Sequence, residues 1–362
     1  MKVIKIVGVV AAVWLLVFAA DAAAQTSLYK VGAATVSLKD GRRNREILAE
    51  LWYPASAAAQ ESDYVYAKAA LFAITEPVKV VRNAPPVEGK KFPLIVLSHG
   101  ILGAEGNYAY LCRFLAARGY VVAAPHHVSQ SRNDFKEEEL FRFWKRAEDV
   151  SKVIDLLLAD KTYSAGIDSG RIGFIGHSVG GHTGLLLAGA AFDFDGFLKY
   201  AAAPLPEDKL PNRFHRLIAQ GYKIPAADAA GNKKNYLDPR ITAFVIMDPT
   251  PVMSGFTAAS LQAIKQPVLY FGASKSTIAP SDQMAAFLKA HIAAIDTVET
   301  HAGHFVFADE GTWFGKLVAS EAFGDGESPD IDRKAIHARI ESTCLQFFQT
   351  HLSMNKETST LK

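Results

Sequence analysis

The sequence predicts an α/β fold in which a mostly parallel central sheet of about eight strands is covered by helices on both faces. Short segments that are apolar at every position alternate along the chain with longer segments of helical periodicity. A strand buried on both faces needs this continuous apolar character, and parallel strands need helical crossovers between them. The chain has 362 residues, of which 49% are hydrophobic, so it can form one large core.

An antiparallel hairpin is expected first, because residues 34–38 and 47–52 alternate between apolar and polar and a polar turn joins them. The strands that follow are short, apolar and rich in β-branched residues, which is typical of buried parallel strands. These strands are expected at residues 93–97, 120–124, 171–175, 241–247, 268–271 and 297–300. Helices are expected at residues 108–117, 137–159, 183–191, 281–290 and 333–351.

Residues 55–89 and 192–240 do not follow this alternation. The second region carries several prolines and many charged residues. A long excursion between two strands of a compact domain is often a lid. We therefore expect residues 192–240 to form a cap-like insertion in a single domain, because no linker divides the chain in two.

The first 24 residues have the pattern of a signal peptide. A short basic start precedes an apolar run, and small residues at Ala22 and Ala24 form the A-x-A pattern that signal peptidase recognises. Cleavage after Ala24 would leave residues 25–362 as a periplasmic or secreted protein without a transmembrane segment. The alternative is an uncleaved anchor, although the run is short for a bilayer span of about 20 residues.

Composition argues against a nucleic-acid partner. The formal net charge is +2, and no long basic run or interleaving of basic and aromatic residues is found. No internal repeat or low-complexity tract is present.

The segment GHSVG, residues 176–180, carries the most chemical information. It has the form G-x-S-x-G and lies between an expected strand and an expected helix, which is the context of a nucleophile elbow. The sharp bend would hold the Ser178 hydroxyl above the edge of the sheet, where the backbone N–H of Val179 could bind an oxyanion. The alternative is a glycine-rich turn without a catalytic role.

A second oxyanion donor is expected in the loop after the first central parallel strand. The sequence there is LSHGILG, residues 97–103. We assign this donor to the backbone N–H of Ile101. His99 is expected to orient the loop rather than to transfer protons.

These motifs together resemble an α/β-hydrolase, and more narrowly the branch of platelet-activating-factor acetylhydrolases and predicted dienelactone hydrolases. The similar stretches are LAELWYPA, KFPLIVLSHGILG, LAARGYVVAAPHH and GFIGHSVGG. The similarity extends from about residue 28 to the last helix and is poor in residues 192–240. It implies ester hydrolysis through Ser, Asp and His without a metal or organic cofactor, acting on small-molecule, lipid or polyester substrates.

The general base should lie late in the chain, because the order in this fold is Ser, acid, His. His304 stands directly after the last expected strand, in a Gly-His-Phe sequence similar to related esterases, and His301 is the alternative. His126 and His127 follow a strand end but lack an evident third ligand for a metal site.

The acid is assigned to Asp248, at the end of the strand at residues 241–247. Many α/β-hydrolases carry it one strand later, where cutinase-like polyester hydrolases have G-A-x-x-D-T-I-A-P. This chain has GASKSTIAP there, with Ser276 at the aspartate position. The acetylhydrolase branch carries its acid at the earlier position, which agrees with Asp248. Asp282 is the rival, although it begins a helix and is expected to be a cap.

Two further expectations concern other residues of the site and its surroundings. Leu102, Phe305 and Trp313 are candidates for an apolar acyl pocket, with ordinary core packing as the alternative. Cys112 and Cys344 lie in expected helices that the resemblance places side by side, so a disulfide is expected in an exported protein, with two buried free thiols as the alternative.

The sequence thus predicts a serine esterase. A cutinase-like polyester hydrolase is the alternative within the enzymes. A catalytically silent α/β-hydrolase fold that binds a ligand or partner is the alternative from another class.

Overall fold

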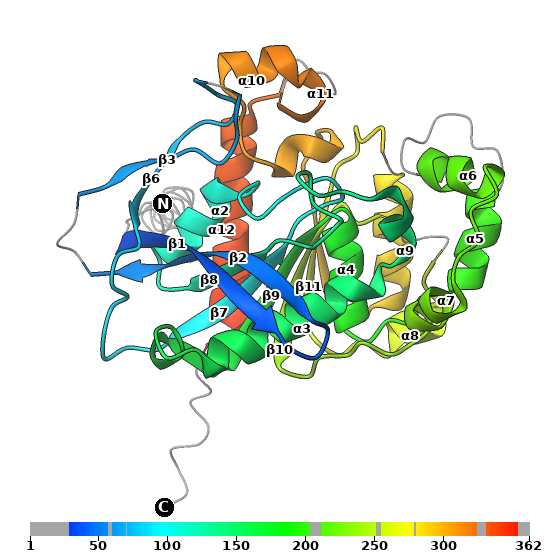
Figure 1. Ribbon diagram of the computed structural model, residues 1–362, viewed down its shortest axis with the longest axis horizontal. Helices are drawn as coiled ribbons and strands as arrows, with labels where there is room; N and C mark the ends of the chain where they lie inside the picture. Colours follow the sequence, from blue (N-terminus) through cyan, green and yellow to red (C-terminus); the bar gives the residue numbers. More distant parts are fainter. Residues whose placement is uncertain are drawn as a thin grey trace, which may run out of the picture.

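A ten-stranded sheet organises the molecule (Figure 1), and its strands lie in the order β12-β11-β10-β9-β7-β8-β2-β1-β6-β3. The computed structural model describes residues 29–56, 60–69, 71–202, 211–250, 255–278, 280–323 and 331–353. The signal peptide expected at residues 1–24 lies outside these ranges. The strands are β1 (Lys30–Asp40), β2 (Arg45–Ala55), β3 (Ser62–Tyr64), β6 (Val78–Arg82), β7 (Phe92–Ser98), β8 (Val121–Pro125), β9 (Ile167–His177), β10 (Ile241–Met247), β11 (Val268–Gly272) and β12 (Ile295–Glu299).

The six strands β7 to β12 are neighbours in the sheet and pair in parallel. Strands β1 and β2 form an antiparallel hairpin, and β2 pairs antiparallel with β8. The central strands are apolar because both of their faces are covered, and every residue of β7 and β8 is buried. The prediction of a mostly parallel sheet with helices on both faces is confirmed. Residues 55–89 add β3 and β6 to the sheet, which is why it has ten strands rather than about eight. They also form a separate pair of two-residue strands, β4 (Lys68–Ala69) and β5 (Phe72–Ala73).

Register brings the carboxyl ends of the central strands to one edge. Ser98 at the end of β7 pairs with Gly176, and Met247 at the end of β10 pairs with His177 and with Phe271. The residues that directly follow these strands therefore lie near one another. In open α/β sheets this edge is where ligands bind.

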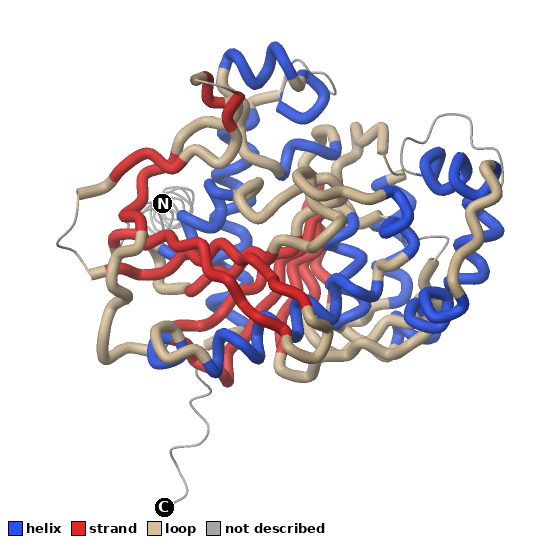
Figure 2. Tube along the Cα trace, in the orientation of Figure 1, coloured by secondary structure: helices blue, strands red, loops and turns tan. Residues whose placement is uncertain are grey.

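Helices cover both faces of the sheet (Figures 1 and 2). One apolar cluster packs α2 and α12 against the sheet, and a second packs α3, α4 and α9 against the other face. These five helices are α2 (Ala109–Ala116), α3 (Trp144–Ala159), α4 (Val179–Leu187), α9 (Ser281–His291) and α12 (Arg333–His351). Helix α12 has the predicted bounds and begins after Asp332, whose side chain accepts a hydrogen bond from the Ala335 amide at 3.0 Å. The expected helix at residues 137–159 is divided into a 3₁₀ turn, η1 (Glu137–Phe141), and α3.

The expected insertion at residues 192–240 contains three helices, α5 (Phe194–Ala202), α6 (Pro211–Ala219) and α7 (Ala226–Asn232). Figure 1 shows them along one flank of the molecule, next to α8 (Ala258–Gln262) and α9. Their phenylalanines are not surface groups, since Phe194, Phe197 and Phe214 are completely buried in the same cluster as α3 and α4. The segment therefore extends the core on this flank, and its action as a substrate-selecting cap stays a prediction.

Four short helical elements remain. The turn η2 (Ser164–Gly166) precedes β9, and η3 (His304–Phe307), α10 (Trp313–Val318) and α11 (Ser320–Phe323) follow β12. Within the described ranges, no helix is both long enough and apolar enough to cross a membrane.

The expected disulfide between Cys112 and Cys344 is not formed in the structure. Helices α2 and α12 are neighbours, as expected, but Cys112 and Cys344 are both free and fully buried in one apolar cluster. A disulfide needs Cβ atoms about 3.8 Å apart with a specific torsion, and the packing of two helices does not by itself supply that geometry. Burial raises the pKa of both thiols well above the usual value, so neither is a reactive thiolate.

Free-thiol titration checks this arrangement directly. Denatured protein that has not been reduced should show two thiols per chain, and reductant should leave the melting temperature unchanged because no cross-link constrains the unfolded chain. The absence of titratable thiols in protein of monomeric mass would contradict the structure.

Candidate active site

Ser178 occupies a strained bend between β9 and α4. Its backbone has φ 57° and ψ −124°, a combination that is unfavourable for a residue with a side chain. Two close backbone approaches support the bend. A methyl group at Gly180 would overlap the carbonyl oxygen of Ser98, and one at Gly176 would overlap the carbonyl oxygen of Gly180. The glycines of the motif are therefore required by packing.

The hydroxyl of Ser178 contacts Thr250 in this structure. The two side-chain oxygens are 3.0 Å apart, and the Thr250 amide donates to the Ser178 carbonyl at 3.1 Å. Both residues are buried. No hydrogen bond joins the side chains of Ser178 and His304 in this structure. Catalytic hydrogen bonds are often formed only when substrate is present.

The side chains of Asp248 and His304 form a buried hydrogen-bonded pair at the same edge of the sheet. Nδ1–H of His304 donates to Oδ2 of Asp248 at 2.5 Å, and neither side chain is more than 3% exposed. Asp248 directly follows β10 and His304 begins the turn η3. Because Nδ1 carries the shared proton, Nε2 keeps a lone pair with which it can accept another.

The alternative residues lie elsewhere. His301 is exposed, its ring nitrogen Nδ1 is 3.5 Å from the hydroxyl of Ser274, and Asp282 is exposed in the first turn of α9. Ser276, at the position where the cutinase-like pattern has aspartate, accepts a hydrogen bond from the Ile278 amide at 3.3 Å as part of a turn.

His177 holds the loop that carries His304. Its Nε2–H donates to the His304 carbonyl at 3.0 Å, and its Nδ1 accepts from the Tyr108 hydroxyl at 2.8 Å. Burial and the nearby His304 ring hold the pKa of His177 well below its usual value, so the ring is neutral. Sequence analysis assigned no role to His177, Tyr108 or Thr250. The available signals were the position of His177 inside the motif and that of Thr250 two residues after Asp248.

The expected oxyanion donors belong to the loop after β7 and to the first turn of α4, both next to Ser178. A Cβ atom placed on Gly100 would lie 3.0 Å from the Cβ of Ser178, so the loop after β7 touches the serine. Within the described part of the chain, the amides of Ile101 and Val179 donate no hydrogen bond, so both can donate to an anionic ligand. Nδ1–H of His99 donates to the Gly100 carbonyl at 2.6 Å, so this residue orients the loop.

The three expected pocket residues are in different surroundings. Leu102 is half-buried with φ 57°, and the Phe305 ring is 5.3 Å from that of His304. Trp313 is 70% exposed on α10, where it contacts Phe72. Trp313 is therefore a surface residue, because the chain leaves the site after η3 and α10 packs against β5 and α11.

His127 belongs to a second chain of Ser, His and Asp side chains. The hydroxyl of Ser98 is 2.9 Å from Nε2 of His127, whose Nδ1–H donates to Asp149 at 3.1 Å. All three residues are at most 1% exposed, so no substrate can reach them. His126 instead bridges Glu105 at 3.1 Å and Asp134 at 3.2 Å. Among the residues that the structure describes, no group of three His, Cys, Asp or Glu side chains is arranged to hold a metal ion.

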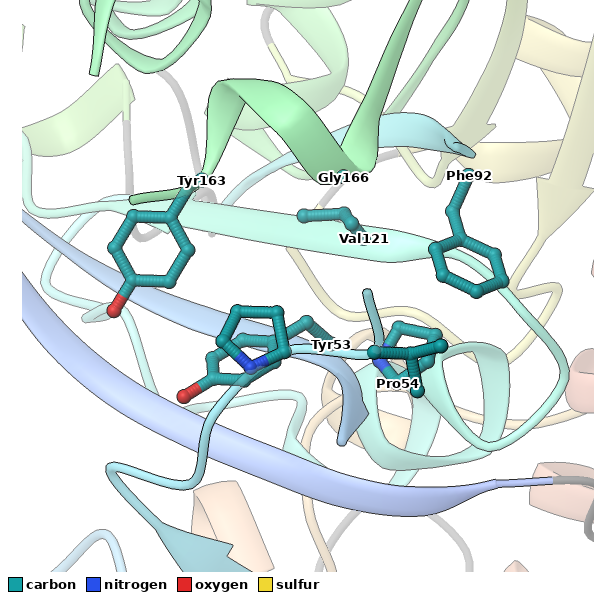
Figure 3. A pocket seen from close by; sticks show the side chains of 8 residues that line it. Tyr53, Pro54, Phe92, Val121, Tyr163 and Gly166 are labelled. Atoms are coloured by element: carbon teal, nitrogen blue, oxygen red, sulfur yellow. The ribbon is translucent and has the colours of Figure 1, made fainter. Parts of the chain in front are cut away.

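A small apolar pocket lies at the opposite end of the strands (Figure 3). It includes the first residues of β7 and β8, far from the edge that carries Ser178. Its lining residues are Tyr53, Pro54, Pro86, Val87, Phe92, Val121, Tyr163 and Gly166. No nucleophile or histidine lines it, so it is not part of the candidate active site.

Comparisons with known proteins agree with this architecture. The model of the alpha/beta hydrolase family matches residues 95–315, and the model of platelet-activating factor acetylhydrolase, isoform II, matches residues 50–136. The solved structure of a ferulic acid esterase from Streptomyces cinnamoneus is similar with a TM-score of 0.61 at 20% identity, covering 90% of this chain and 91% of that one. A Klebsiella pneumoniae protein assigned as a dienelactone hydrolase gives a TM-score of 0.49 at 16% identity, covering 89% and 99%.

Substitution of Gly180 tests the packing of the bend. Gly180→Ala should lower the free energy of unfolding by about 3 kcal/mol or prevent folding, because the added methyl group meets backbone atoms that cannot rotate away. Gly41→Ala is the matched control, since nothing lies within 4 Å of a Cβ atom there, and it should change stability by less than about 0.5 kcal/mol. Urea denaturation measures both, and equal stability of the two variants would contradict the packing described.

Proposed function

Because the chain belongs to the α/β-hydrolase family, we propose that it is a serine hydrolase of carboxylic esters that works through Ser178, His304 and Asp248. The observation that carries the proposal is the buried pair of His304 and Asp248 at 2.5 Å, held at the edge where Ser178 occupies its strained bend. The similarity to an acetylhydrolase model and to a ferulic acid esterase supports an ester as the substrate class.

The reaction follows from the positions of the groups. His304 Nε2 takes the proton of Ser178 while Oγ attacks the ester carbonyl, and Asp248 stabilises the imidazolium that forms. The protonated His304 then donates this proton to the leaving alcohol, which leaves an acyl group on Ser178. Water activated by His304 releases the acid in the second half of the reaction.

Charge on the carbonyl oxygen is stabilised by backbone donors. The amide of Ile101 belongs to the loop after β7 and that of Val179 to the first turn of α4, so both are fixed by the fold before the tetrahedral intermediate forms. The neutral His177 keeps the backbone of His304 in place during both halves of the reaction.

The proposed setting is the periplasm or the exterior, after cleavage of the signal peptide near Ala24. The proposed substrates are small-molecule or lipid esters, and no cofactor is required by the mechanism. Polyester hydrolysis stays an alternative, because residues 272–280 resemble the cutinase-like pattern except that Ser276 stands at its aspartate position.

Labelling with a fluorophosphonate tests the proposal against a catalytically silent binding protein. Folded protein should be labelled at Ser178, and Ser178→Ala should abolish the label. The labelled protein should also hydrolyse p-nitrophenyl esters, and a series from acetate to palmitate gives the preferred acyl length. Folded protein that neither takes the label nor hydrolyses any ester of the series would exclude an esterase.

The acid is tested by a matched pair of variants. Asp248→Asn should lower kcat by about 10⁴-fold, because the amide no longer stabilises the correct tautomer and the imidazolium of His304. Asp282→Asn should retain normal kcat, since its side chain is exposed on α9. Steady-state rates measure both, and near-normal kcat for Asp248→Asn would place the acid elsewhere.

A further inference from the structure

Arg146 is a completely buried cation whose hydrogen bonds go to the oxyanion loop rather than to a carboxylate. It lies in the first turn of α3, and its side chain is 0% exposed. Nη1 donates to the His99 carbonyl at 2.5 Å, Nη2 donates to the Gly100 carbonyl at 3.3 Å, and Nε donates to Oε1 of Gln130 at 2.7 Å. No carboxylate of the described residues lies within 4.0 Å of its nitrogens.

This arrangement is costly for stability alone. Burial of an arginine without an ion-pair partner carries a desolvation penalty that neutral hydrogen bonds only partly offset. The nearest carboxylate on the helix, Asp149, is already engaged by Arg43, Arg45 and His127. Burial lowers the pKa of Arg146 to about 9, which still leaves the guanidinium charged at neutral pH.

The geometry of the peptide group links Arg146 to the nucleophile. The carbonyl of Gly100 and the amide of Ile101 belong to one planar trans peptide, in which C=O and N–H point in opposite directions. Three donors gather on that carbonyl, namely Arg146, Nδ1 of His99 at 2.6 Å and the Gly103 amide at 3.1 Å. The Ile101 amide therefore points away from Arg146, and Gly100 itself lies against Ser178.

We propose that Arg146 is a positioning residue for acyl transfer, which fixes the peptide between Gly100 and Ile101 and polarises its N–H toward the oxyanion. A cation on the carbonyl oxygen draws electron density from the amide and strengthens it as a hydrogen-bond donor. The same guanidinium holds the preceding carbonyl, of His99, so two successive peptide groups are fixed by one side chain. The inference rests on the proposed esterase function.

The test compares substrate turnover with binding of a trifluoromethyl ketone. In the ketone complex, Ser178 Oγ bonds to the carbonyl carbon, the serine proton passes to His304, and the former carbonyl oxygen becomes an anion in the oxyanion hole. Arg146→Met should lower kcat about 10- to 100-fold and weaken ketone binding by a similar factor, since loss of one oxyanion donor costs 10²- to 10³-fold. KM should change by less than about threefold, because the ground-state ester carries no charge to stabilise.

Two further variants separate this role from folding. Lys152→Gln is the control, because Lys152 also lies on α3 but pairs with Asp155 at 3.3 Å rather than with the loop, and it should leave kcat and ketone binding unchanged. Arg146→Lys keeps the buried charge without the two-pronged guanidinium and should give intermediate losses in both quantities. If the methionine variant does not fold, the lysine variant decides.

Each result has a defined meaning. A folded Arg146→Met protein with normal kcat and normal ketone affinity would overturn the inference, as would losses confined to KM or to melting temperature. If Arg146→Lys is the variant that decides, normal values of kcat and ketone affinity in that protein would likewise overturn it. Ester turnover and fluorophosphonate labelling of the wild-type protein are measured first, so a failure of the esterase proposal is seen independently of Arg146.

Discussion

The close approach of α4 to the ends of β7 and β9 is the constraint on which the site depends. At Gly180 the helix comes so near to Ser98 that no side chain fits between them. This contact places the first turn of α4 beside the loop after β7, and it forces Ser178 into a positive φ at the junction. Ser178 and both expected oxyanion donors are therefore positioned by one backbone contact, and the strain of the bend is offset by the surrounding core.

Several polar residues near this contact are completely or almost completely buried. Ser98, His127 and Asp149 form a hydrogen-bonded chain below the loop, and Arg43 and Arg45 neutralise the carboxylate from its other side. Buried hydrogen bonds and ion pairs of this kind hold the elements that carry them in one arrangement. It joins the ends of β7 and β8 to α3, so the oxyanion loop is anchored to three elements of the core.

The histidines near the site divide into two kinds by their surroundings. Burial, with contributions from neighbouring cationic or imidazole groups, holds the pKa of His99, His127 and His177 well below the usual value. These three rings stay neutral and act through fixed hydrogen bonds. His304 differs in its partner, because its ring nitrogen Nδ1 donates to the carboxylate of Asp248 at 2.5 Å.

The sequence by itself determined the features that depend on neighbouring residues. The alternation of apolar segments with helical ones predicted the parallel sheet, the spacing of Gly176, Ser178 and Gly180 predicted the bend, and helix 333–351 was predicted to its end residues. The vacant carboxylate position at Ser276 pointed to Asp248. The bend and the helix are signals within one turn or one helix, where local propensity and packing agree, whereas Asp248 was assigned by comparing two strand ends with related families.

Only the tertiary structure decided the contacts between distant segments. Thr250 meets Ser178, His177 meets Tyr108, and Arg146 reaches the loop after β7, in each case because strand register and helix packing bring separate parts of the chain together. The same reason explains the errors. Helix adjacency placed Cys112 and Cys344 near each other without the Cβ geometry of a disulfide, and Trp313 follows the site in sequence but lies on a helix that packs outside it. Neither proximity along the chain nor the adjacency of two helices determines where a side chain points. That direction depends on how whole elements pack.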